Sequence, residues 1–150
     1  MNSNNQSSER SKKTLKYIAI VFLVFGFIGF CDAAYLTIEH YRGVIPPCSV
    51  VDGCESVLTS PYAKIAGIPI SMFGMAYYFS IIILAIVYLD SRSRAVMRVC
   101  AGLSCVGFLT SIFLAYLQVF VIRYICLYCM ISAASSAVLF AGGLIAWKRI

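Results

Sequence analysis

The chain has 150 residues, of which 61% are hydrophobic and 12% are charged, and its formal net charge is +6. A soluble domain of this length could not bury so much apolar surface, so the composition excludes a soluble protein and predicts a single all-α membrane domain. The basic residues form no stripe interleaved with aromatic residues, which argues against nucleic acid as a partner. Their distribution instead carries information about topology.

The N-terminal segment, residues 1–15, is polar, basic and rich in Asn and Ser, which predicts a disordered tail. The first predicted span is residues 16–38, because the apolar run after Lys16 contains one charge, Asp32, and is long enough to span a bilayer. Because no small-residue cleavage site follows a short apolar region, we expect a retained first span and not a signal peptide. A second apolar run covers residues 67–89.

Residues 99–146 form a block of 48 residues whose only charged member is Arg123, near the middle. As one helix this block would be about 72 Å long, against a hydrocarbon core of about 30 Å. We therefore predict a helical hairpin with spans at roughly 99–121 and 125–146, joined by a very short turn. The resulting domain, residues 16–150, is a bundle of four transmembrane helices with a cysteine-bearing loop between the first two.

The Lys and Arg residues are unevenly divided between the two ends of these spans. Nine of the twelve lie in the tail together with Lys16, in the 90–98 loop and at the C-terminus, and three lie in the 39–66 loop and the hairpin turn. This bias predicts a cell (inner, or cytoplasmic) membrane protein with both termini in the cytoplasm. Four cysteines then gather at the outer face, where disulfides persist: Cys48, Cys54, Cys126 and Cys129.

The pair Cys126 and Cys129 has the Cys-x-x-Cys spacing at the start of the predicted fourth span. The positive end of the helix dipole and nearby Arg123 favour the thiolate, which is the species that attacks a disulfide. Alone, this motif is also typical of a metal half-site or of a static disulfide. The remaining cysteines fall within predicted helices, where we expect small packing residues: Cys31, Cys100 and Cys105.

The second pair, Cys48 and Cys54, is close enough in sequence to form a small loop disulfide. It has three interpretations: a staple of a non-catalytic membrane protein, half of a four-thiolate metal site, or the outer half of a redox relay. The wide spacing and an oxidising compartment argue against metal. In a relay, the outer pair exchanges with a soluble protein thiol and the inner pair passes electrons to a membrane quinone. The chain has no haem, Rossmann or flavin motif, so we expect neither flavin nor metal.

The order of these motifs resembles the vitamin K epoxide reductase (VKOR) family in its prokaryotic form. The likeness rests on Cys48 and the run "CESVLTSPYA" from Cys54, then on "GIPISMFGMAYY", and then on the Cys-x-x-Cys that opens the fourth span. It extends from about residue 27 to residue 147. Many prokaryotic members carry a fused thioredoxin-like domain, whereas this chain ends at Ile150, so we expect a separate DsbA-like thioredoxin-fold partner.

The resemblance implies a role for each cysteine of the two pairs. Cys126 and Cys129 match the active-site pair, with Cys129 nearest the quinone. Cys48 matches the residue that meets the soluble partner, and Cys54 the one that exchanges with Cys126. The resemblance also implies a quinone pocket lined by Ser60 of the loop and, from the second span, by Phe73, Tyr77 and Tyr78, although ordinary helix packing explains these aromatic residues equally well.

The sequence departs from the animal members at two positions. Those members hold the vitamin K head group with an Asn in the second helix and a Tyr four residues after the second active-site Cys, where this chain has Ile70 and Ala133. The expected chemistry is therefore reduction of ubiquinone or menaquinone, with vitamin K or quinone-epoxide reduction as the alternative. Asp32, the one acid within a span, either helps protonate the reduced quinone or bonds to a neighbour such as Tyr35 or Tyr41.

Overall fold

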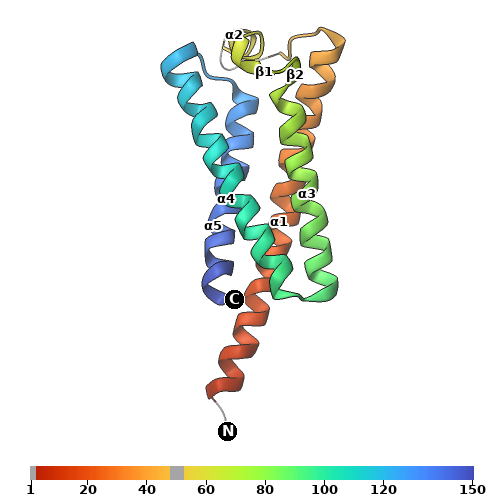
Figure 1. Cartoon of the computed structure of the whole chain (residues 1–150), viewed down its shortest axis with the longest axis vertical. Helices are drawn as coiled ribbons and strands as arrows, with labels where there is room; N and C mark the ends of the chain where they lie inside the picture. The colour runs from red at the N-terminus through yellow and green to blue at the C-terminus, as the bar shows by residue number, and fades with distance from the viewer. Residues whose placement is uncertain (1–2, 48–52) are drawn as a thin grey trace.

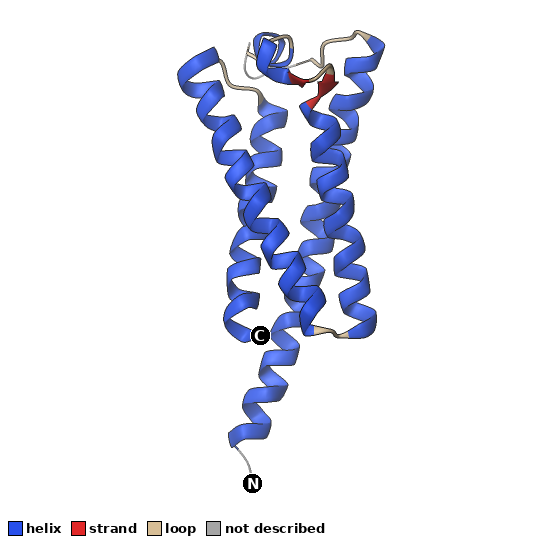
Figure 2. Ribbon diagram, in the orientation of Figure 1, coloured by secondary structure: helices blue, strands red, loops and turns tan. Residues whose placement is uncertain are grey.

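The computed structural model describes residues 3–47 and 53–150; residues 1–2 and 48–52 are not described. Four long helices make up most of the chain, and the short elements lie between the first and second and between the third and fourth of them (Figures 1 and 2). In chain order the elements are α1 (Ser3–Arg42), α2 (Cys54–Leu58), the 3-10 helix η1 (Pro61–Ala63), β1 (Lys64–Ile65), β2 (Ile68–Pro69), α3 (Ile70–Ser91), α4 (Arg94–Tyr116), the π-helix η2 (Leu117–Ile122) and α5 (Leu127–Arg149).

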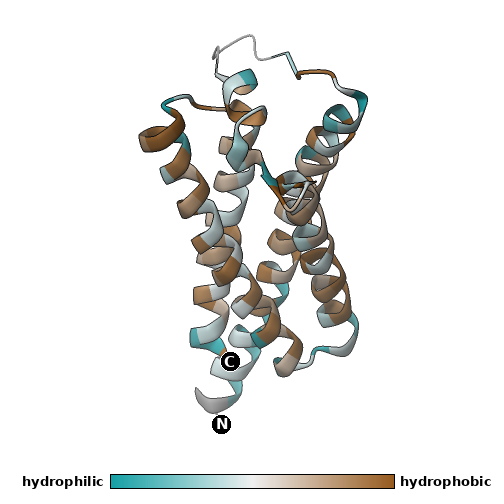
Figure 3. Cartoon of the chain, turned by 45° about the horizontal axis from the view of Figure 1, so that its top comes forward, coloured by the Kyte–Doolittle hydropathy of each residue, from teal (hydrophilic) through white to brown (hydrophobic). Residues whose placement is uncertain are grey.

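Four of the helical segments are long and apolar enough to cross a membrane, namely Asn5–Arg42, Ile70–Ser91, Arg94–Ile122 and Leu127–Arg149. The first and third segments contain the predicted spans in full, and the second and fourth begin three and two residues after the predicted starts, so the predicted four-helix fold is confirmed. Large apolar side chains such as Phe27, Leu109 and Phe113 are exposed on the outside of the bundle. These exposed apolar side chains suit contact with lipid, and Figure 3 shows apolar residues along all four helices.

The N-terminal segment differs from the predicted disordered tail, because α1 already begins at Ser3. No Pro or Gly interrupts the chain before Gly26, so the helix of the first span continues backwards without a break. Glu9 and Lys12 form an ion pair at 3.7 Å on this extension. The Ser11 hydroxyl donates a 3.0 Å hydrogen bond to the carbonyl of Arg149, which ties the extension to the end of α5.

The four long helices diverge toward one end of the bundle. Both chain termini lie at the opposite end, where α1 extends beyond the other helices (Figure 1). At the divergent end, α1 and α3 lie on one side, α4 and α5 lie on the other, and α2 lies across the top with β1 and β2. β1 and β2 pair antiparallel, and Ala66 and Gly67 both have positive φ in the two-residue turn between them. The short elements therefore cap one end of the bundle.

The buried side chains form two clusters. The larger one holds the four long helices together and includes Phe22, Ile81 and Leu139. The smaller one lies at the capped end, where Cys54 and Val57 of α2 pack with Cys126. The second cluster therefore joins a loop cysteine to the Cys-x-x-Cys pair.

Candidate active site

A short turn before α5 positions Cys126. Arg123 caps the end of the π-helix η2 and adopts the left-handed conformation with φ 60°. The amide of Tyr124 then donates a hydrogen bond to the carbonyl of Gln118 at 3.1 Å. The side chain of Gln118 is buried, and its Oε1 accepts a 3.1 Å hydrogen bond from the amide of Cys126. Gln118 therefore fixes the backbone of the reactive cysteine, a role that no sequence motif indicates.

Cys126 and Cys129 are both free thiols at the N-terminus of α5. Cys126 is the N-cap residue and is fully buried. The Cys129 thiol donates a hydrogen bond to Cys126, and the amides of Cys129 and Tyr128 donate as well, so the pKa of Cys126 falls from its ordinary value near 9 to about 7. The predicted thiolate is thus favoured at Cys126 by hydrogen bonds at the start of the helix.

Helix α2 brings Cys54 to the same place. Cys54 is buried and disulfide-bonded, whereas the other five described cysteines are free; Cys48 lies outside the described residues. Gly53 lies directly against the turn before α5, because a Cβ atom there would be 2.7 Å from the carbonyl oxygen of Ile125. A disulfide-bonded cysteine and a free thiol pair therefore meet at the capped end.

A cavity of about 630 Å³ opens between the four long helices beneath the cap, and such a volume is typical of pockets for small organic ligands. All four residues predicted to line a quinone pocket border it, namely Ser60, Phe73, Tyr77 and Tyr78. Cys129 also borders the cavity, whereas Cys126 is not part of its wall. Ile70 and Ala133, the two positions that depart from the animal members, are part of the wall as well.

Tyr78 and Ser60 use their hydroxyl groups within the protein. The Tyr78 hydroxyl lies 2.7 Å from the carbonyl oxygen of Ser132, 2.9 Å from the Ser132 hydroxyl and 3.0 Å from that of Ser136. Its ring packs so closely on Gly29 that a side chain there would collide with it. The Ser60 hydroxyl donates to the carbonyl of Val57 at 2.8 Å, within the cap. Tyr78 thus joins α1, α3 and α5, which matches the packing interpretation of this residue.

Two other polar atoms at the cavity have no partner. Among the described residues, Asp32 Oδ2 and the Tyr77 hydroxyl are buried without a hydrogen bond. Neither predicted neighbour of Asp32 supplies one, since the ring of Tyr35 packs on Tyr128 with centroids 5.4 Å apart. The Tyr41 hydroxyl instead contacts the Met72 sulfur at 3.8 Å.

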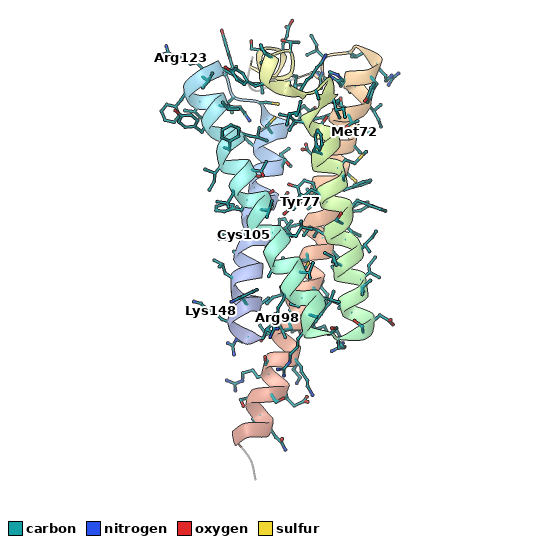
Figure 4. All side chains as sticks on the ribbon, viewed as in Figure 1. Met72, Tyr77, Arg98, Cys105, Arg123 and Lys148 are labelled. Carbon is teal, nitrogen blue, oxygen red and sulfur yellow. The ribbon has the colours of Figure 1, made fainter. Side chains whose placement is uncertain are left out.

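The charged residues at the two ends of the bundle agree with the predicted division. Arg98 and Lys148 lie at the end that holds the C-terminus, and Arg123 lies at the capped end (Figure 4). The two predicted cysteine pairs thus belong, as far as the structure describes them, to the end opposite the termini. Among residues 3–47 and 53–150 there is no group of three His, Cys, Asp or Glu side chains that could hold a metal ion.

Comparison with known proteins identifies the family. No curated protein matches the chain at the threshold applied. The profile of the vitamin K epoxide reductase family, however, matches residues 20–143, which include α3, α4, the cap, the free thiol pair and most of α1 and α5. The chain therefore belongs to the vitamin K epoxide reductase family and is a multi-pass membrane oxidoreductase.

Proposed function

We propose that this protein is a quinone-dependent thiol oxidase that reoxidises a separate DsbA-like thioredoxin-fold protein and so supports disulfide bond formation. The observation that carries the proposal is the position of the free pair Cys126 and Cys129. On one side the pair packs against disulfide-bonded Cys54, and on the other side Cys129 borders the cavity. A pair between a disulfide and a pocket can receive electrons from the first and deliver them to the second.

The cavity fits a quinone head group. Its wall is mostly apolar, and two of its polar atoms, Asp32 Oδ2 and the Tyr77 hydroxyl, have no partner among the described residues. A flat apolar ring with two carbonyl oxygens suits such a site, because a few placed polar groups orient a ligand in a mostly apolar pocket. A quinone bound there supplies the oxidising power, since it takes up two electrons and two protons.

The relay proceeds by disulfide exchange in the protein. A thiolate of the reduced partner attacks a Cys48–Cys54 disulfide at Cys48, and the partner's second thiol releases it, which leaves both loop cysteines reduced. Cys54 then attacks Cys126 of the oxidised inner pair and frees the Cys129 thiol. Cys48 resolves this mixed disulfide, and the inner pair is left as the dithiol that reduces the quinone.

The free thiols at Cys126 and Cys129, together with the disulfide at Cys54, correspond to the stage of this relay that precedes quinone reduction.

Two further observations favour the relay over a static disulfide staple and over a vitamin K reductase. A static staple does not require a thiol whose pKa is lowered to about 7, as that of Cys126 is. The apolar Ile70 and Ala133 offer no side-chain hydrogen bond to a vitamin K head group.

We also propose that the capped end faces the outer side of the cell membrane and that both termini are cytoplasmic. Nine of the twelve Lys and Arg residues support this orientation. It places the loop cysteines in the compartment where a thioredoxin-fold oxidase works and where disulfides persist.

The test uses the full chain in lipid nanodiscs with a reduced DsbA-like protein as substrate, with and without ubiquinone or menaquinone. We expect oxidation of the substrate only with quinone, and its loss in both Cys126→Ala and Cys129→Ala. Cys105→Ala is the matched control, because it removes a free thiol that is outside the cavity wall, and it should keep full activity. Oxidation that needs no quinone, or that survives both active-site substitutions, would contradict the proposal.

A further inference from the structure

Asp32 is an acidic side chain of α1 that lines the cavity, and the other acidic residue of the cavity wall, Glu39, lies closer to the end of α1. Its Oδ2 is buried and has no hydrogen-bond partner in the described chain. An acidic group in a membrane span is costly unless it is paired, and such groups mark proton or ligand pathways. No group in residues 3–47 or 53–150 satisfies this carboxyl oxygen, so a ligand in the cavity is its available partner.

Asp32 is also close to the thiol pair. Its carboxylate interacts electrostatically with Cys126 and with Cys129, although it belongs to α1 and the thiols to the start of α5. Tyr78 is the third group whose charge interacts with it. The carboxyl group is thus within electrostatic range of both sulfur atoms, and it borders the cavity together with Cys129.

The hydrogen bond between the two thiols creates a need for a base. Because the Cys129 thiol donates to Cys126, the negative charge rests on Cys126 and the proton rests on Cys129. Cys129, however, is the cysteine at the cavity wall. Its proton must leave when the pair becomes a disulfide, and neither Ile70 nor Ala133, which also form the wall, can accept a proton.

We propose that Asp32 is a catalytic proton carrier, which takes the proton from the Cys129 thiol and passes it to the quinone oxygen; this inference rests on the proposed function. The Tyr77 hydroxyl, the second unpartnered polar atom, binds the other carbonyl oxygen of the ligand. The step balances. The S–S bond forms between the Cys126 thiolate and Cys129, two electrons reach the quinone, one proton comes through Asp32, and solvent returns the proton that Cys126 had already lost.

Other titratable side chains also border the cavity, and they come from other parts of its wall. From α3 come Tyr77 and Tyr78, from α5 comes Cys129, and the mouth beneath the cap carries Glu39, His40, Tyr62 and Lys64. The Tyr78 hydroxyl is already occupied by Ser132 and Ser136. Glu39 lies 3.6 Å from the Arg42 guanidinium, toward the end of α1. Asp32 is therefore the acid placed to act at the thiol pair.

The experiment compares wild-type protein with Asp32→Asn, Asp32→Glu and Tyr77→Phe, each as the full chain in nanodiscs. Asp90→Asn is the matched control, because Asp90 is an exposed acid at the far end of α3. In anaerobic single turnovers of dithiol protein with ubiquinone, we expect Asp32→Asn to be about 100-fold slower, the usual effect of losing a general acid or base. Asp32→Glu should recover part of the rate, and Tyr77→Phe should weaken quinone binding about fivefold.

A second readout needs no quinone. The pH dependence of Cys126 alkylation should move to lower pH in Asp32→Asn, because a negative charge that opposes the thiolate has been removed. A purely structural role for Asp32 would not produce this shift, and the control should not show it. An Asp32→Asn protein that reduces quinone at the wild-type rate would overturn this inference alone. A wild-type protein whose dithiol does not reduce quinone would overturn both this inference and the proposed function.

Discussion

The contact between Gly53 and the turn before α5 makes a specific prediction about the relay. A Cβ atom on Gly53 would lie 2.7 Å from the carbonyl oxygen and 3.0 Å from the amide nitrogen of Ile125. Both are backbone atoms, so no rotamer change can relieve the collision. Because ordinary contact begins at 3.4 Å, Gly53→Ala must displace α2 from the turn by about 0.7 Å, and Cys54 follows Gly53 directly in the chain.

A displacement of this size is large for a reaction between two sulfur atoms. A misplacement of about 1 Å can reduce the rate of a positioned reaction about 100-fold, so we expect exchange between Cys54 and Cys126 to slow about tenfold or more in Gly53→Ala. The pKa of Cys126 should stay near 7, because the groups that lower it belong to α5 and not to α2.

The assay traps the exchange in a Cys48→Ala background, in which Cys54 has no loop partner. After oxidation of the inner pair, Cys54 attacks Cys126 and frees Cys129, and a Cys54–Cys126 mixed disulfide accumulates that peptide mapping detects. Gly102→Ala is the matched control, since a Cβ atom there meets nothing within 4 Å. Equal trapping rates in Gly53→Ala and Gly102→Ala, or no mixed disulfide in the background itself, would refute this reasoning.

Three further predictions concern the thiol pair, the bundle and the orientation. The rate of Cys126 alkylation should rise with pH through a midpoint at about 7, the pKa of the thiol. Cys129→Ala should move this midpoint to higher pH, because the lost hydrogen bond stabilised the thiolate, and an unchanged midpoint would exclude that cause. Tyr78→Phe should reduce the free energy of unfolding in detergent by about 1 kcal/mol, since it removes the hydrogen bonds of its hydroxyl to α5, and wild-type stability would count against that role. A membrane-impermeant thiol reagent should label reduced Cys48 or Cys54 from the outer side while a reporter after Ile150 behaves as cytoplasmic, and labelling from the inner side alone would reverse the proposed orientation.

The spans could be predicted from the sequence because each apolar run is far longer than a buried soluble helix needs to be. The 99–146 block shows this most clearly, since its length alone requires a reversal, and the single charge at Arg123 marks where the reversal occurs. The helical extension of α1 could not be predicted in this way. Its composition resembles that of a disordered segment, and its contact with α5 through Ser11 and Arg149 joins residues that are 138 positions apart.

The candidate site could be predicted only where the spacing of residues in the sequence indicates a particular chemistry. The Cys-x-x-Cys pair is such a case, whereas the aromatic residues of α3 were candidates only through the resemblance to the family. Gln118, Gly53 and the unpartnered state of Asp32 could not be predicted, because each depends on contacts between segments distant in sequence. The sequence pointed to Arg123 and the helix dipole as sources of thiolate stabilisation, and the structure adds hydrogen bonds to the Cys126 sulfur from Cys129 and Tyr128 of α5.

The most direct test is an anaerobic single turnover of fully reduced protein with one equivalent of quinone, followed by counting and mapping the thiols by mass spectrometry. In a variant with both loop cysteines replaced, Cys48→Ala and Cys54→Ala, we predict that two thiols are lost for each quinone reduced. The lost thiols should be those of Cys126 and Cys129, joined to each other as a disulfide. If quinone is reduced while both of these thiols remain free, or if it is not reduced at all, electrons do not pass from this pair to a quinone.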